Sequence, residues 1–102
     1  MTNPPTEEQI FAAISTILVE ALLVDFAKIK MESKIFDDLG AESIDVLDIR
    51  FRMEQAFGCK IDQDKLVRSL GEGLNGREIQ KMFTVGSLVK YMRNQLQSRI
   101  KP

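Results

Sequence analysis

The chain of 102 residues is 44% hydrophobic and 28% charged, with a formal net charge of −1 at pH 7. These values fit one globular domain over residues 1–102 and exclude global disorder. The chain contains no histidine and one cysteine, which excludes an internal disulfide and catalysis by a Ser-His or Cys-His pair.

The first expected helix follows a proline-containing start. Pro4 and Pro5 predict an extended or flexible lead-in over residues 1–5. Thr6 and Gln9 have the spacing of a capping box, which predicts a helix from this point to Leu22 or Leu23. Apolar residues at helical spacing form a stripe wide enough to face a core: Ile10, Phe11, Ile14, Ile17, Leu18, Ala21 and Leu22.

The N-terminus lacks the basic and apolar regions of a signal peptide, and no apolar run approaches the length of a membrane span. We therefore expect a cytoplasmic protein without stable membrane insertion.

Residues 24–42 lose clear periodicity. A connection this long in a small domain is usually functional or packed with its own side chains. The second case is favoured by its apolar residues: Val24, Phe26, Ile29, Ile35, Phe36 and Leu39.

A second long helix is predicted from Ser43, a good N-cap residue, to Phe57, with Gly58 as the stop. We expect its core face to contain Ile44, Leu47, Phe51, Met53 and Phe57. A phosphate ester on Ser43 would meet unpaired backbone N–H groups and the positive end of the helix dipole. The alternative is a serine that only caps the helix.

Two short helices are predicted at 63–70 and 77–83, on either side of a glycine-containing turn at 71–76. A last helix is expected from Thr84-Val85 onward, with a basic end that suits the helix dipole. Its core positions include Leu88, Val89 and Met92.

The segment Asp38-Leu39-Gly40-Ala41-Glu42-Ser43-Ile44-Asp45, with Asp48, Glu54 and Phe57-Gly58 after it, resembles the acyl carrier proteins and the related peptidyl and aryl carrier domains. Glu42 and Ile44 depart from the usual Asp and Leu but keep charge and bulk. The resemblance extends from the first helix to the last. It implies an all-α bundle of three main helices, with short helices in an extended helix II–III region.

The resemblance also implies 4′-phosphopantetheine, derived from coenzyme A, on Ser43. Such a protein holds acyl intermediates as thioesters, presents them to fatty acid, lipid or polyketide biosynthetic enzymes, and does not itself catalyse. The implied partners are a phosphopantetheinyl transferase and acyl-loading, elongating and acyltransferase enzymes. The implied oligomeric state is a monomer. Gly40 would be the flexible turn that precedes the modified serine.

The segment between the second and last long helices, residues 62–83, is longer than the short family pattern. Here the chain resembles the specialised acyl carrier proteins that carry very long or hydroxylated acyl chains for lipid A. The alternative is tolerated loop growth, which costs little free energy.

Charge is distributed unevenly, with ten acidic and four basic residues in 1–50 and five acidic and ten basic residues in 51–102. We expect partner enzymes to contact the region around the serine, at Asp38, Glu42, Ile44, Asp45, Asp48, Arg50 and Arg52. The two arginines depart from the family pattern and either pair with Asp48, Glu54 or Gln55 or alter partner choice. The basic half lacks the interleaved aromatic residues of a nucleic-acid site.

Residues expected to line an acyl pocket are Leu47, Phe51, Met53, Ile79 and Met82, although ordinary core packing explains each of them equally well. Two other functions stay open: a peptidyl or aryl carrier, and an unmodified helical adaptor that binds a partner helix. The adaptor predicts full function after Ser43→Ala, whereas a carrier predicts none.

Overall fold

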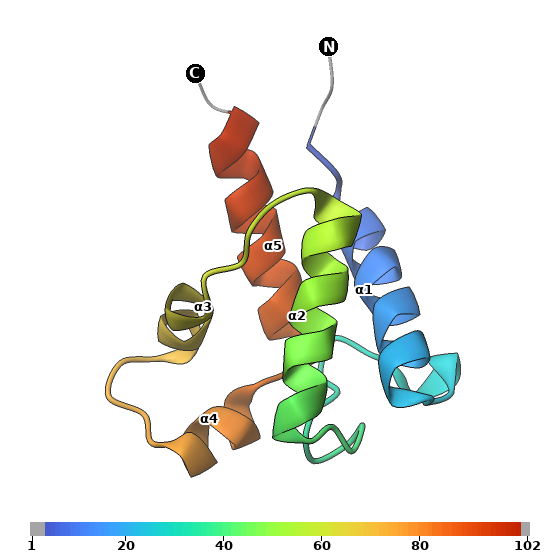
Figure 1. Ribbon diagram of the computed structural model, residues 1–102, viewed down its shortest axis with the longest axis vertical. Helices are drawn as coiled ribbons and strands as arrows, with labels where there is room; N and C mark the ends of the chain where they lie inside the picture. Colours follow the sequence, from blue (N-terminus) through green and yellow to red (C-terminus); the bar gives the residue numbers. More distant parts are fainter. Residues whose placement is uncertain (1–3, 101–102) are drawn as a thin grey trace.

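The computed structural model describes residues 4–100, with side chains described as far as Gln97. Regular secondary structure in this part of the chain is helical, apart from one isolated β-bridge between Lys34 and Thr84. The predicted all-α class is confirmed (Figure 1). The elements are α1 (Glu7–Leu22), the short 3₁₀ helix η1 (Phe26–Lys28), α2 (Ser43–Phe57), α3 (Gln63–Leu70), α4 (Gly76–Met82) and α5 (Val85–Ile100).

Helix α1 begins with the predicted capping box. The Thr6 hydroxyl accepts the Gln9 backbone N–H at 3.1 Å, and the Gln9 side chain accepts the Thr6 N–H at 2.9 Å. Most of the predicted stripe is buried, and Phe11, Ala21 and Leu22 pack at its edge. Pro4 and Pro5 precede α1 without regular structure, while residues 1–3 of the expected lead-in lie outside the described residues.

The core forms where α1 packs against both α2 and α5 (Figure 1). Helix α3 packs against α5 and α4. Among the described residues, no Cα atom of α2 lies within 8 Å of one in α3, α4 or α5. The backbone of α2 therefore lies closest to that of α1, and side chains fill or line the space between α2 and the other helices.

The connection from α1 to α2 is packed by its own side chains and tied to the start of α5. Ile29, Ile35 and Leu39 are buried, whereas Phe26 is exposed. The Ile35 N–H donates to the carbonyl of Phe83 at 2.9 Å, and the Val85 N–H donates to the carbonyl of Ser33 at 2.9 Å. These bonds fix the connection that leads to Ser43.

Residues 62–83 form α3, a turn and α4, as the sequence predicted, with α4 one residue earlier than expected at each end. Asp62 caps α3 by accepting the backbone N–H groups of Asp64 and Lys65. Asn75 caps α4 in a capping box with Glu78. Within the described residues, no helix is both long and apolar enough to cross a membrane.

Candidate functional site

Ser43 is the first residue of α2, not its N-cap as the sequence predicted. The N-cap is Glu42, whose backbone is extended and whose N–H donates to the Asp45 carboxylate at 2.8 Å. Asp45, as the third helical residue, thus bonds back to the N-cap residue, and the serine takes no part in the cap. The Ser43 side chain is exposed and has no hydrogen-bond partner among the described residues, so its oxygen is available at the positive end of α2.

The turn before the serine is held by hydrogen bonds between residues close in sequence. Gly40 has a φ of 74°, in the left-handed region that glycine tolerates best. The Asp38 carboxylate accepts the Lys34 N–H at 2.8 Å, and the Ala41 N–H donates to the Ile35 carbonyl at 3.1 Å. The turn that precedes Ser43 is thus a fixed structure rather than a loose loop.

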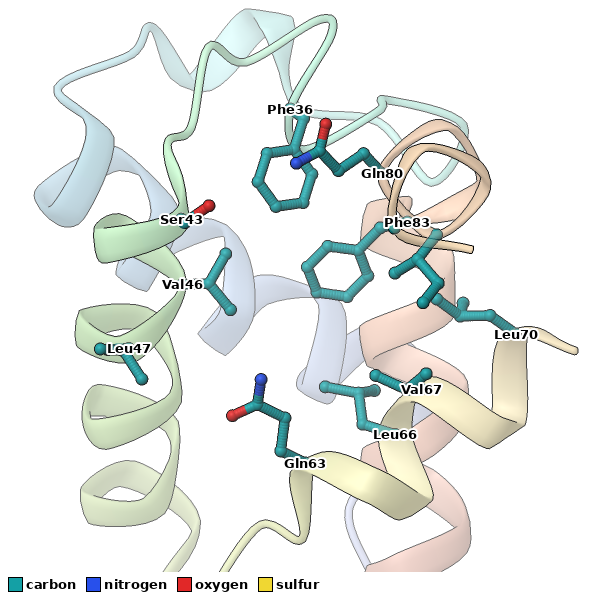
Figure 2. Close-up of a pocket in the computed structure, with 12 residues that line it drawn as sticks. Phe36, Ser43, Val46, Leu47, Gln63, Leu66, Val67, Leu70, Gln80 and Phe83 are labelled. Carbon is teal, nitrogen blue, oxygen red and sulfur yellow. The ribbon is translucent and has the colours of Figure 1, made fainter. Parts of the chain in front are cut away.

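A cavity lies beside Ser43, between α2 and the α3–α4 pair (Figure 2). It has a volume of about 200 Å³ and is partly open to solvent. Leu47 and Ile79 line it, and Figure 2 shows the Ser43 side chain at one end and Gln63 at the other. The remaining lining residues are Phe36, Val46, Leu66, Val67, Leu70, Gly76, Gln80 and Phe83. Most of these side chains are apolar, so the cavity suits an apolar ligand.

The other three residues expected in an acyl pocket lie elsewhere. Met53 is 1% exposed and lines a smaller cavity in the core. Phe51 is 59% exposed and lies in a shallow groove between α1 and α2, and the exposed Met82 lines a separate groove beside α3 and α5. These positions leave Leu47 and Ile79 as the expected residues that the structure brings next to Ser43.

The predicted single apolar face of α2 is wrong, because α2 carries two apolar stripes. Ile44, Leu47 and Phe51 form an exposed stripe. The stripe that faces the core contains Val46, Ile49, Met53 and Phe57. The sequence analysis missed Val46 as a cavity residue, although its position three residues after Ser43 places it on the same side of the helix.

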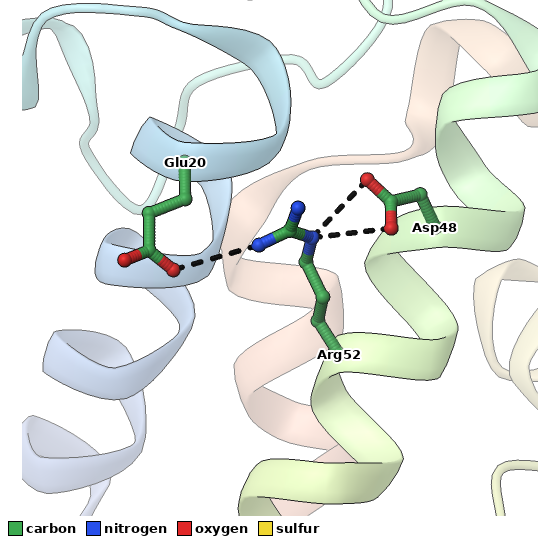
Figure 3. A network of polar contacts seen from close by, with 3 residues as sticks. All are labelled: Glu20, Asp48 and Arg52. Carbon is green, nitrogen blue, oxygen red and sulfur yellow. Dashed lines mark hydrogen bonds and ion pairs between the residues drawn. The ribbon is translucent and has the colours of Figure 1, made fainter.

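The charged residues near Ser43 are partly paired with each other. Glu42 and Asp48 are exposed, and Asp45 is half-buried by its capping role. Arg52 contacts the Asp48 carboxylate at 3.1 Å, as one prediction had it, and reaches Glu20 of α1 at 3.6 Å (Figure 3). Such exposed pairs contribute little stability, but they reduce the negative charge that Asp48 presents.

Arg50 faces a different direction from Arg52. Its Nη1 donates to the Gln63 side chain of α3 at 3.2 Å, a partner that the sequence analysis did not anticipate. Its Nε is buried without a hydrogen-bond partner in the described part of the chain. The two departures from the family pattern therefore have different surroundings.

Comparison with known proteins places the site in context. Residues 12–74 match a family model described as "Phosphopantetheine attachment site". The chain is 33% identical to an acyl carrier protein of Thermotoga maritima, over 89% of this chain and 96% of that protein. It is 34% identical to an acyl carrier protein of Wolinella succinogenes, over 81% and 92% of the two chains. An acyl carrier protein of Campylobacter lari is 44% identical over 58% of this chain and 80% of its own.

Proposed function

Because the chain belongs to the acyl carrier protein family and contains a phosphopantetheine attachment site, we propose that 4′-phosphopantetheine is attached to the hydroxyl of Ser43. Four serines lie within the residues that match the family model, namely Ser15, Ser33, Ser43 and Ser69. Ser15 and Ser33 are 0% and 8% exposed. The Ser69 hydroxyl donates to the Leu66 carbonyl at 2.6 Å within α3. Ser43 combines an exposed, unpaired hydroxyl with a helix N-terminus, and this observation carries the proposal.

The surroundings of Ser43 fit a phosphodiester. Attack of the Ser43 oxygen on the β-phosphorus of coenzyme A forms the new P–O bond, releases adenosine 3′,5′-bisphosphate and transfers the serine proton to a base. The chain has no histidine, so we assign that base to the transferase. The negative charge of the product then lies at the N-terminus of α2, where it is stabilised by the helix dipole.

The arm supplies a terminal thiol, on which the protein holds an acyl group as a thioester. The cavity beside Ser43 would shield the acyl chain, with Leu47 and Ile79 among its walls. Each buried methylene contributes about 0.8 kcal/mol as an upper estimate. A chain buried in this way is retained but can still be withdrawn by a partner enzyme.

Partner enzymes are proposed to approach the exposed side of α2. Ile44 and Leu47 offer apolar contacts there, and Glu42 offers an exposed carboxylate. Basic surfaces of the transferase and of acyl-transferring enzymes would complement this region. The protein itself supplies no catalytic step in this proposal. The cytoplasmic location, the monomeric state and the likeness to lipid A carriers stay predictions.

The test is intact mass after incubation with coenzyme A and a broad-specificity phosphopantetheinyl transferase. We expect one phosphopantetheine group on the unaltered chain and on Ser69→Ala, the matched control, and none on Ser43→Ala. Addition to Ser43→Ala would move the attachment to another residue. No addition to any variant, with a transferase that modifies a control carrier, would favour the unmodified adaptor.

A further inference from the structure

A single side-chain hydrogen bond joins α2 to α3 among the described residues, from Arg50 Nη1 to Gln63 Oε1 at 3.2 Å. The two helices do not approach each other closely along their backbones. The Arg50–Gln63 bridge therefore spans a gap that is otherwise lined by side chains of the cavity beside Ser43.

The bridge lies at the end of the cavity remote from Ser43. Arg50 follows Ser43 by seven residues, which is about 10 Å along the axis of α2. In Figure 2, Gln63 and Ser43 lie at opposite ends of the cavity, and the Gln63 amide points into it. An apolar chain that enters beside Ser43 meets Val46, Leu66 and Phe83 before it reaches the bridge.

The chemistry of the bridge opposes further entry of an apolar chain. The Nε of Arg50 is already buried without a partner among the described residues, and the Arg50 side chain also lines the small core cavity beside Met53. A chain that pushed past would break the bond to Gln63 and bring methylenes against the half-buried Arg50 guanidinium, which would have lost that bond. Burial of unpaired polar groups is costly, more so for charged ones.

We propose that the Arg50–Gln63 bridge limits the length of acyl chain that the protein can enclose. This inference rests on the proposed attachment of the arm to Ser43. Arg50 and Gln63 are then residues that determine chain-length specificity, and neither takes part in forming the thioester.

Arg52 provides a matched control. It is an arginine on the same helix, two positions further along, but its partners are Asp48 and Glu20 and it makes no bond to Gln63. Arg52→Ala therefore removes one positive charge, as Arg50→Ala does, but it leaves the Arg50–Gln63 bridge intact.

The experiment loads the unaltered chain, Arg50→Ala, Gln63→Ala and Arg52→Ala with saturated acyl groups from butanoyl to hexadecanoyl, using the matching acyl-coenzyme A and a transferase. Intact mass verifies loading, and circular dichroism verifies folding. Thioester cleavage by hydroxylamine then reports how well each acyl chain is enclosed. Because Gln63 is exposed, its variant tests the bridge even if Arg50→Ala fails to fold.

In the unaltered chain and in Arg52→Ala, cleavage should slow as the acyl chain lengthens and then level off. In Arg50→Ala and Gln63→Ala, the levelling should move to longer chains, with each additional enclosed methylene slowing cleavage by up to about fourfold. The inference is overturned if the bridge variants level off at the same chain length as the unaltered chain, or if Arg52→Ala shows the same shift as they do. It is also overturned if cleavage in the unaltered chain never levels off, or if the bridge variants lose protection at every chain length. Failure to load the unaltered chain, with a transferase that modifies a control carrier, would instead refute the attachment at Ser43.

Discussion

The Tyr91 hydroxyl anchors the start of α3, and Tyr91→Phe tests how strongly. Tyr91 Oη accepts the Asp62 backbone N–H at 3.2 Å and donates to the carbonyl of the same residue at 3.4 Å. Asp62 is also the N-cap of α3. One hydrogen bond of this kind contributes about 1 kcal/mol, and the longer second bond adds less. We expect Tyr91→Phe to lower the free energy of unfolding at pH 7 by about 1 kcal/mol.

The same hydroxyl gives stability a dependence on alkaline pH. Burial raises the pKa of Tyr91 above its ordinary value of 10.0, and the nearby Asp62 carboxylate acts in the same direction. As pH rises past 10, the unfolded chain loses the tyrosine proton while the folded chain keeps it. The folded state then binds more protons, so stability falls with increasing pH. This contribution is present in full below pH 10 and is lost as pH rises through the folded-state pKa.

Denaturant unfolding followed by circular dichroism measures both effects, at pH 7 and at steps through the alkaline range. Lysines also titrate there, so the informative quantity is the difference between the unaltered chain and Tyr91→Phe. Tyr91 is the one tyrosine in a chain without tryptophan, so its absorbance titration gives its pKa without assignment. The reasoning is refuted if the free energy of unfolding of Tyr91→Phe at pH 7 lies within about 0.3 kcal/mol of that of the unaltered chain, which is about the scatter of independent sites. It is also refuted if the two proteins lose stability equally at alkaline pH.

Three further predictions, one of them with a control substitution, test other parts of the fold by denaturant unfolding. Leu18→Ala removes a fully buried side chain and should cost about 3 to 5 kcal/mol, whereas Leu23→Ala, at an 88% exposed position, should cost under about 0.5 kcal/mol; similar costs would contradict the assigned core. Asp62→Ala removes the cap of α3 and should cost about 1 kcal/mol, so an unchanged midpoint would argue against the cap. Gly40→Ala adds a Cβ at a φ of 74° where no other atom lies within 4 Å, so it should lower the free energy of unfolding by about 1 kcal/mol through backbone strain alone. Unchanged stability would show that the turn relaxes.

Local signals in the sequence were sufficient for the helices and for the family. The capping box at Thr6 and the glycine at position 58 act within a few residues, so they can be read without the rest of the fold. The segment around Ser43 is equally local. Its resemblance to acyl carriers agrees with the family that the comparisons show.

At the start of α2, local signals do not decide which of two adjacent residues is the N-cap. Glu42 and Ser43 are adjacent and each can begin a helix, and the sequence analysis chose the serine. In the structure the N-cap is Glu42, whose N–H bonds to Asp45, while the Ser43 oxygen is left unpaired. This difference of one residue decides whether the hydroxyl is used up in capping or is free for modification.

Other features depended on where distant segments pack. Helical periodicity allows two apolar stripes on α2, and packing against the other helices buries Ile49 and Met53 while it leaves Phe51 exposed. Arg50 and Arg52 look alike in the sequence, but Gln63 of α3 lies near one and Glu20 of α1 near the other. The sequence by itself determined the helices, the family and the candidate serine. The tertiary structure alone decided the walls of the cavity and the partners of the arginines, because these contacts join residues from separate helices.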